Sequence, residues 1–210
     1  MYTTGYMHIY LGPMFSGKTS KLMELYHYYN TKLNKKCLII GHNLDCRYNK
    51  YKITSHDKRE YLDCYKFTKI EDFMNIYNNH NKSDSIVHSD NSLYDDLNYK
   101  VISEVDVILI DECQFFEDII LVTKLVEMGK KVFLFELEGN SNQQIFGETY
   151  KLLPYCDKIE KLNGKCRHCG IKNSSIFSVC NVSFEKTSQI DVGGDEKYHS
   201  VCRNCLHNYK

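Results

Sequence analysis

Residues 7–19 read MHIYLGPMFSGKT and contain the most informative motif of the sequence. Its first five residues form a short, largely apolar run that ends at Gly12. From Lys18 onward, apolar residues recur at helical spacing as far as Leu33. The pattern predicts a strand, a glycine-bounded turn and a helix over residues 18–33. Residues 12–19 also fit GxxxxGK[ST] without a gap, in the strand-to-helix context that this motif requires.

The spacing of this motif suits the binding of a nucleotide's phosphates. Backbone N–H groups of the loop surround the phosphates, and the N-terminus of the following helix adds partial positive charge. Lys18 would reach the outer phosphates, and the Thr19 hydroxyl would bind Mg²⁺. The plain alternative is a glycine-rich turn without nucleotide. The predicted nucleotide-binding loop consists of Gly12, Pro13, Met14, Phe15, Ser16, Gly17, Lys18 and Thr19.

Three further apolar runs predict buried strands at residues 37–41, 105–110 and 131–137. Residues 119–128 have helical periodicity and stop at Gly129. Strands that alternate with helices predict an α/β fold, in which a parallel sheet is covered by helices on both faces.

Two changes in composition predict the domain organisation. The alternation ends near Pro154, so we expect a nucleotide-binding domain at residues 1–153 and a small separate domain at 154–210. Residues 75–98 are rich in Asn, Asp, Ser and Tyr with little periodicity, which predicts a surface insertion.

The strand expected before residue 111 ends in two acids, Asp111 and Glu112. A P-loop protein needs a carboxylate at such a strand end to hold magnesium, and Asp111 fits that role. Strand alternation would turn Glu112 to the other side, where it could act as a base. The alternative is a pair of solvated acids. A GTPase would carry an [NT]KxD motif, which reads the base, after this strand. Residues 81–84, NKSD, match the motif but lie upstream of the strand, which excludes a GTPase.

Ten cysteines are the unusual part of the composition. Two CxxC pairs in a short C-terminal segment, Cys166 with Cys169 and Cys202 with Cys205, predict a closed, structural zinc site. A redox pair or two disulfides are the alternatives. His168 or His199 could replace one of the cysteine ligands, but four cysteines already complete the site. We therefore expect both histidines beside the zinc or exposed to solvent. The remaining cysteines are expected to be small hydrophobes: Cys37, Cys46, Cys64, Cys113, Cys156 and Cys180.

Charge and hydropathy exclude several functions. The 210 residues include 27 Lys and Arg against 27 Asp and Glu, so the chain lacks the basic excess of a protein that coats nucleic acid. The N-terminal residues do not resemble a secretory signal, and no apolar run reaches the roughly 18 residues of a membrane span. We therefore expect a cytoplasmic protein with no membrane or nucleic-acid partner.

Together these motifs resemble the zinc-containing P-loop class of thymidine kinases, the cellular, bacterial and poxviral type. Residues 12–19 are similar to its nucleotide loop, residues 111–116 to its DEGQFF segment, and residues 193–202 to its GGxxKYHxVC element. Residues 45–48 resemble its DxRY element, and residues 55–57 its THD triplet. The matches follow the family's order and cover most of the chain.

The resemblance implies transfer of the γ-phosphoryl group of ATP to the 5′-hydroxyl of thymidine, with deoxyuridine as a second substrate. Glu112 matches the family's base, while Lys18 and Arg47 would stabilise charge on the transferred group. Thr19 and Asp111 would hold Mg²⁺. Besides the loop, the ATP-binding residues implied are Asp45, Cys46, Arg47, Asp111, Glu112, Cys113 and Gln114.

For the nucleoside, the family uses backbone groups of a lasso segment, which corresponds to residues 189–193. The substrate-binding residues implied are Met14, Phe115, Leu137, Ser141, Phe146, Gln189, Ile190, Asp191, Val192, Gly193 and Tyr198. Phe115 and Phe116 could instead be ordinary core residues, and Tyr198 a surface aromatic. The family is typically a homotetramer.

Three departures bear on substrate affinity. Cys113 replaces the glycine of DEGQFF, Ser141 replaces a substrate-stacking aromatic, and Asp191 is more polar than its usual counterpart. A deoxynucleoside kinase of shifted specificity is therefore an alternative. A nucleotide-gated module whose zinc ribbon binds nucleic acid is another.

Overall fold

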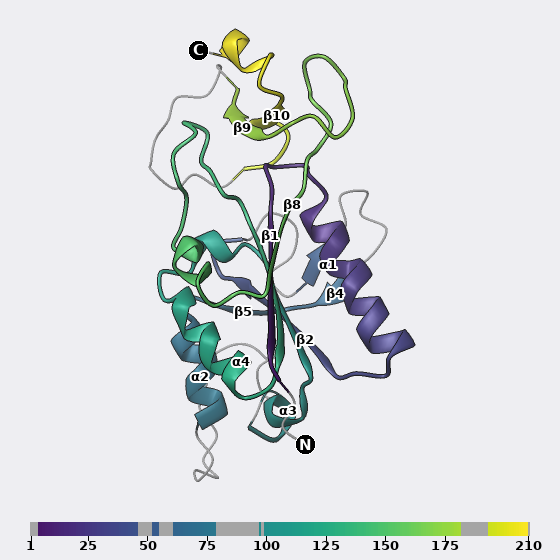
Figure 1. Ribbon diagram of the computed structural model, residues 1–210, viewed down its shortest axis with the longest axis vertical. Coiled ribbons are helices and arrows are strands. Elements are labelled where there is room, and N and C mark those ends of the chain that lie inside the picture. The colour runs from purple at the N-terminus through teal and green to yellow at the C-terminus, as the bar shows by residue number, and fades with distance from the viewer. Residues whose placement is uncertain are drawn as a thin grey trace.

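A six-stranded parallel sheet forms the centre of the molecule, with the strand order β5-β2-β6-β7-β1-β8 (Figure 1). The computed structural model describes residues 4–45, 52–54, 61–78, 97, 99–181 and 193–209. Its sheet consists of β1 (Tyr6–Leu11), β2 (Cys37–His42), β5 (Tyr65–Phe67), β6 (Val107–Ile110), β7 (Lys131–Glu136) and β8 (Lys158–Lys161).

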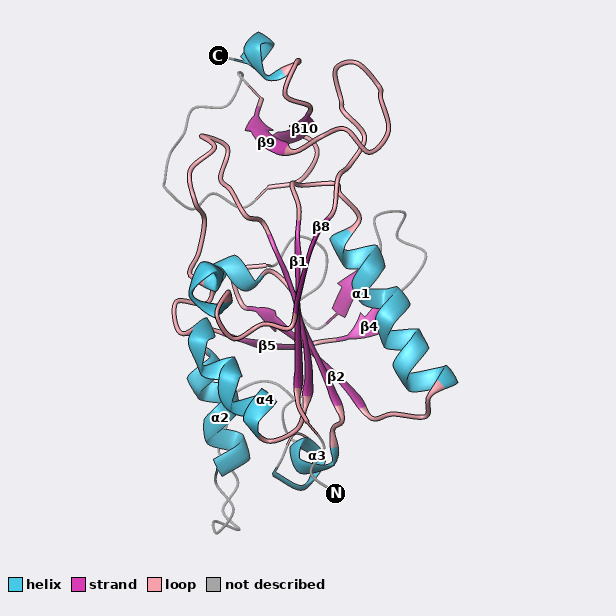
Figure 2. Ribbon diagram, in the orientation of Figure 1, coloured by secondary structure: helices cyan, strands magenta, loops and turns pink. Residues whose placement is uncertain are grey.

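Helices cover both faces of this sheet, as the sequence predicts (Figure 2). Helix α1 (Lys18–His27) packs on one face, where its buried Leu22 joins a cluster with Tyr10 and Phe133. Helices α2 (Ile70–Asn78), α3 (Tyr99–Glu104) and α4 (Thr123–Glu127) contribute to the cluster that contains Met7 and Ile9 on the other face. Adjacent strand residues point to opposite faces, so Ile9 and Tyr10 enter different clusters.

The expected helices differ in detail from those observed. The helix that starts at Lys18 continues after His27 as a π-helical turn, Tyr28–Lys32. The segment predicted as one helix at 119–128 is a 3₁₀ turn, Ile119–Val122, followed by α4. It ends at Gly129, whose φ of +81° is a conformation that glycine adopts at no steric cost. Further 3₁₀ turns occur at Cys113–Phe115, Thr149–Leu152 and Leu206–Tyr209.

Strand β8 lies beyond the boundary that the sequence suggested at residue 153. It pairs in parallel with β1, so residues 158–161 belong to the main sheet. A separate hairpin, β9 (Phe177–Cys180) with β10 (Tyr198–Val201), follows and has its own small core. We propose that the C-terminal domain begins near Gly164, about ten residues later than expected.

Both ends of the predicted insertion at residues 75–98 include residues of the main domain. Residues 75–78 belong to α2, and Ile76 is buried against the sheet. Leu97 is buried in the same cluster. Residues 79–96 and 98 lie outside the described residues. A second small hairpin, β3 (Lys52–Thr54) with β4 (Tyr61–Asp63), stands apart from the main sheet.

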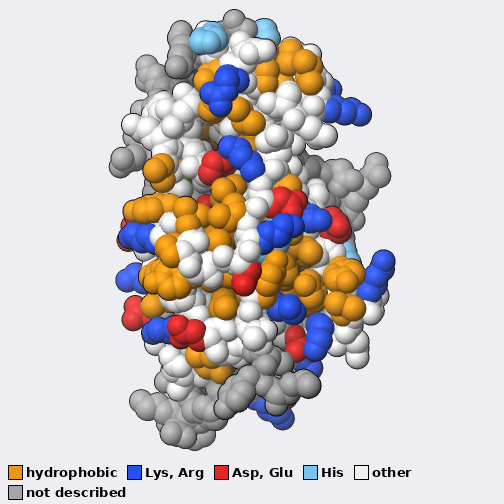
Figure 3. Space-filling model, viewed as in Figure 1, with side chains coloured by type: hydrophobic (Ala, Val, Ile, Leu, Met, Phe, Trp, Pro, Cys, Tyr) orange, Lys and Arg blue, Asp and Glu red, His pale blue; other side chains and the backbone are white. Residues whose placement is uncertain are grey.

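Positive and negative side chains are mixed on the surface (Figure 3), as the equal numbers of basic and acidic residues predict. On the face in Figure 3, Lys and Arg side chains are interspersed with Asp and Glu and form no large field of one sign. No helix in the described part of the chain has both the length and the apolar character needed to span a bilayer.

Candidate active site

The carboxyl ends of three neighbouring strands bring the predicted site together. Gly12 follows β1, Asp111 follows β6, and Leu137 follows β7. The Gly12 N–H donates to the Glu136 carbonyl at 3.2 Å, and the Asp111 N–H donates to the Ile40 carbonyl at 2.8 Å. The loop and the acid are thus held at the edge where open parallel sheets bind ligands.

Two glycines, Gly12 and Gly17, shape the backbone of the loop at residues 12–19. A Cβ on Gly12 would lie 2.4 Å from Ser16 Oγ and 2.7 Å from the Leu162 carbonyl oxygen, so this close turn requires glycine. Gly17 has a φ of +87° and precedes α1 with no side-chain cap, which leaves the first N–H groups of the helix available. Lys18 is buried, and its Nζ donates to the carbonyls of Gly12 at 3.0 Å and Pro13 at 2.8 Å. The ammonium group therefore lies against the loop.

Asp111 and Glu112 are both buried beyond the end of β6. Glu112 has a φ of +54°, so a left-handed turn sets its direction, and the expected strand alternation does not apply. Its carboxylate accepts a hydrogen bond from Gln114 Nε2, and Gln114 Oε1 accepts one from the Leu137 N–H at 3.1 Å. Gln114 therefore fixes the carboxylate relative to the end of β7.

Cys113 has no exposed surface and packs in the main core beside Phe116. Its Sγ donates to the Ile110 carbonyl at 3.1 Å, and burial raises the pKa of the thiol well above its ordinary value. The residue that replaces the family's glycine thus adds bulk to the core behind the site. Phe116 is likewise fully buried, which confirms the alternative prediction that it is an ordinary core residue.

Two of the aromatic residues predicted to line the substrate pocket, Phe115 and Phe146, are in contact. Phe115 packs edge-to-face on Phe146 with ring centroids 5.7 Å apart. A Cβ on Gly147 would lie 2.5 Å from Gln114 Cα, so this chain segment touches the segment of the acid directly. Ser141 is half-buried in the turn that lies between β7 and Phe146 in the sequence.

The C-terminal domain contacts the loop through a residue that the sequence analysis did not identify. The Met14 N–H donates to Ser178 Oγ at 3.0 Å, and a Cβ on Gly164 would lie 2.7 Å from the Phe15 carbonyl oxygen. Ser178 shares one face of the hairpin with Tyr198, because Tyr198 pairs with Cys180. A single serine in a strand carries no motif, so spacing alone could not have found it.

Several predicted residues fall outside the described part of the chain. These are Cys46 and Arg47 together with Gln189, Ile190, Asp191 and Val192. Their neighbours are placed: Asp45 accepts a hydrogen bond on its carbonyl from the buried Lys66, whose Nζ also lies 3.6 Å from the Asp45 carboxylate. A Cβ on Gly193 would lie 3.3 Å from the Tyr198 ring, so the last lasso residue adjoins that tyrosine.

The four predicted zinc ligands form one cluster. The Sγ atoms of Cys166, Cys169, Cys202 and Cys205 all lie within 4.8 Å of one another. The sulfurs of Cys169 and Cys202 are 3.9 Å apart, close to the roughly 3.8 Å edge of a tetrahedron with Zn–S bonds of about 2.3 Å. Burial opposes ionisation of Cys166, but backbone N–H groups, including that of Cys202 at 3.3 Å, lower its pKa to about 6. The cluster therefore fits a four-thiolate zinc site.

Glu136 is a buried acid that the sequence analysis overlooked. It is the last residue of β7, 5% exposed, and its Oε2 has no hydrogen-bond partner among the described residues. Burial raises the pKa of its carboxyl to about 8, opposed by the nearby Thr149 and Lys18 side chains. Burial therefore favours the neutral form of the Glu136 carboxyl, beside the phosphate-binding loop.

This pKa predicts an unusual dependence of stability on pH. Between about 4.5 and about 8 the unfolded chain releases the Glu136 proton while the folded chain retains it, so the free energy of unfolding falls as pH rises. We expect Glu136→Gln to match the parent protein near pH 4.5 and to exceed it at pH 8.5 by on the order of 3 kcal/mol. Urea unfolding at the two pH values measures this difference.

The exposed Glu127→Gln serves as the control for loss of one charge. A constant difference between Glu136→Gln and the parent protein at both pH values would contradict the assignment.

Comparisons with known proteins bear on this constellation of loop, acids and cysteine cluster. The family model described as thymidine kinase matches residues 5–94 and 63–206. The thymidine kinase of Amsacta moorei entomopoxvirus is 34% identical over 205 residues, which cover 96% of this chain and 98% of the relative. This chain belongs to the thymidine kinase family.

Relatives from other sources support the same membership. The thymidine kinase of Acanthamoeba polyphaga mimivirus is 36% identical over 207 residues, which cover 95% of this chain and 81% of the relative. Thymidine kinase 1 of Dictyostelium discoideum is 32% identical over 209 residues, which cover 97% and 78%. The family resemblance that the sequence motifs predict is therefore confirmed.

Proposed function

We propose that this protein transfers the γ-phosphoryl group of ATP to the 5′-hydroxyl of thymidine, with deoxyuridine as a second substrate. The observation that supports the proposal is that the phosphate-binding loop, Asp111 and Glu112 all follow strand ends at one edge of the sheet. The aromatic wall formed by Phe115 and Phe146 lies next to the segment of the two acids. This arrangement suits phosphoryl transfer to an uncharged acceptor, in which positioning and charge stabilisation supply most of the acceleration.

Each residue then has a chemical task. The loop amides and Lys18 would bind the β- and γ-phosphates, and Thr19 with Asp111 would hold Mg²⁺, which when bound neutralises charge on the phosphates. Glu112 would accept the proton of the 5′-hydroxyl as it attacks the γ-phosphorus, oriented by its hydrogen bond from Gln114. Arg47 would stabilise charge on the transferred group.

The nucleoside would lie between the aromatic wall and the C-terminal domain. Met14, Phe115, Leu137 and Phe146 would contact its apolar surfaces, and Tyr198 with the lasso residues 189–193 would contact the base. Ser178 ties this domain to the loop through Met14, so a zinc-stabilised hairpin would set the distance between base and phosphates.

Ser141 bears on which base the enzyme selects, because it is small where the family has an aromatic residue that stacks on the substrate. We expect thymidine to be phosphorylated faster than deoxycytidine, deoxyadenosine or deoxyguanosine in the presence of ATP and Mg²⁺, as measured by formation of the monophosphates. A higher kcat/KM for one of the other three would replace thymidine as the substrate. No phosphorylation, combined with salt-dependent binding of nucleic acid, would favour a binding module instead.

We also propose that the protein works in the cytoplasm as a homotetramer. The oligomeric state rests on the family resemblance, and the location on the sequence patterning described above. Light scattering on the purified protein would test the oligomeric state.

A further inference from the structure

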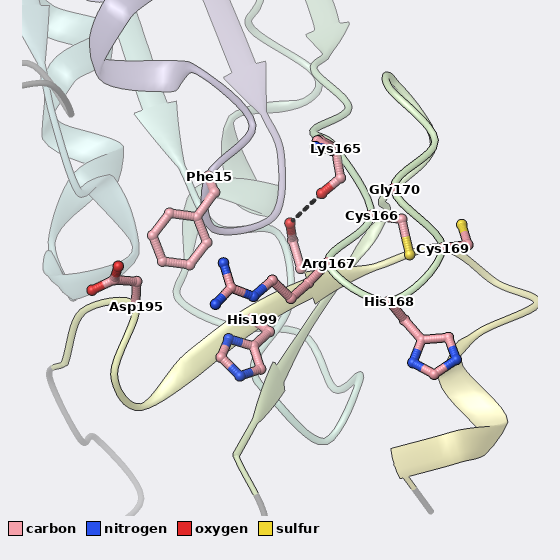
Figure 4. A pocket seen from close by; sticks show the side chains of 10 residues that line it. Phe15, Lys165, Cys166, Arg167, His168, Cys169, Gly170, Asp195 and His199 are labelled. Carbon is pink, nitrogen blue, oxygen red and sulfur yellow. Dashed lines mark hydrogen bonds between the residues drawn. The ribbon is translucent and has the colours of Figure 1, made fainter.

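A cavity of about 710 Å³ lies between the phosphate-binding loop and the C-terminal domain, and the proposed reaction does not use it (Figure 4). Phe15 of the loop lines one side, and Arg167 and His199 line another. Its volume falls within the range of small-molecule sites, about 300–1,000 Å³. It is therefore large enough for a ligand of nucleotide size.

The cavity adjoins the proposed nucleoside site. In β10, His199 and Ser200 line the cavity, whereas Tyr198 is not part of its lining. In the loop, the Met14 N–H donates to Ser178 Oγ, and the side chain of the next residue, Phe15, extends into the cavity (Figure 4). The two sites are therefore neighbours built on the same two segments.

Two exposed cations, Lys165 and Arg167, line the cavity on the side of the C-terminal domain. Asp195 is the one carboxylate in the lining, which also includes two of the predicted zinc ligands, Cys166 and Cys169. Within the described ranges, neither Lys165 nor Arg167 forms an ion pair. Zinc held by four thiolates carries a formal charge of −2 and would attract cations, but the Arg167 side chain extends away from the sulfurs toward Phe15 (Figure 4). Its guanidinium is therefore directed into the cavity.

We propose that this cavity is a second binding site, which takes a nucleoside phosphate. The guanidinium of Arg167 has the planar fork that binds phosphate through two hydrogen bonds, and Lys165 adds a second positive charge. The exposed part of the Phe15 ring offers a surface on which a base can stack. Asp195 can accept a hydrogen bond from an amino group of the base or a sugar hydroxyl. The inference takes from the proposed function only that the enzyme works among nucleoside phosphates.

Equilibrium dialysis with the non-hydrolysable ATP analogue AMP-PNP tests this site on the zinc-loaded full-length chain. We expect two AMP-PNP per chain for the parent protein and one for Arg167→Gln. The matched control is Arg203→Gln: Arg203 holds the same position in the other CxxC pair but packs over the Phe177 ring at 5.3 Å. It should retain two AMP-PNP, and both variants should retain zinc. One AMP-PNP on the parent protein, or two on Arg167→Gln, would overturn the proposal.

A second arm separates a nucleotide from a bare phosphate ligand. In Lys18→Ala, which weakens the loop site, the remaining AMP-PNP should be lost when Arg167→Gln is added. Inorganic tripolyphosphate should displace AMP-PNP from this site about tenfold less well than ATP does, because it lacks a base to stack on Phe15. Equal displacement would refute the nucleoside part of the proposal. Neither measurement requires phosphoryl transfer, so failure here is distinct from failure of the kinase assignment.

Discussion

Glu112→Gln is expected to reduce kcat for thymidine phosphorylation by about 10²–10⁴-fold, the usual contribution of a general base. The amide has nearly the shape of the carboxylate, and its oxygen can still accept the hydrogen bond from Gln114 Nε2. It cannot take the proton of the attacking hydroxyl. The loss should therefore fall on the chemical step and not on the fold.

Binding of ATP should survive this change, because the contacts of Lys18 with the loop carbonyls do not involve Glu112. We expect the Kd for AMP-PNP to stay within about threefold of the parent value, as measured by calorimetry. Glu117→Gln, an exposed acid five residues further along the chain, is the control and should keep the parent rate. Normal turnover by Glu112→Gln would remove Glu112 from the role of base.

The parts of this site that the sequence predicted are those encoded by consecutive residues. The loop at residues 12–19 and the acids after β6 follow buried strands of largely apolar sequence, which is the pattern of a central parallel strand. The CxxC pairs carry their own spacing. In each case the signal and the chemistry lie within a few residues.

The elements that the sequence analysis missed depend on distant partners. Strand β8 reads KIEK and lies at the edge of the sheet, where charged residues are common, so no apolar run marks it. Strand β5 reads YKF and buries Lys66, whose Nζ reaches Asp45 twenty-one residues away. Such contacts exist only after folding.

The direction of individual side chains could not be predicted from the sequence either. Alternation along an extended strand was expected to orient Glu112, but the residue adopts a left-handed conformation after β6 has ended. As a result, the Cys113 side chain points into the core and not toward the substrate side of the site. Glu136 was overlooked for a related reason, since nothing in KVFLFE separates a solvated strand-end acid from a buried one.

Replacement of a cluster cysteine should have the second large effect, since the C-terminal domain has little core of its own. Three of the six residues in its buried cluster are cysteines, and the others are Val179, Val201 and Leu206. So few apolar side chains cannot offset the entropy of ordering the segment. Structural zinc in small domains contributes an apparent 10–16 kcal/mol, roughly the scale needed here.

We therefore expect Cys202→Ser to lose bound zinc, to expose residues 164–209 to rapid proteolysis and to reduce thymidine phosphorylation by more than about 100-fold. AMP-PNP binding at the loop should persist with a smaller loss, because Gly12 stays anchored to β7 while only the Met14 bond to Ser178 is released. Cys156→Ser is the control, a half-buried cysteine outside the cluster. Retention of one zinc per chain, or of the parent rate, by Cys202→Ser would show that the cluster does not hold the hairpin in place. If nucleoside turnover falls while the loop still binds AMP-PNP, the zinc site acts by positioning Ser178 and Tyr198 against the loop, and the reaction depends on both domains.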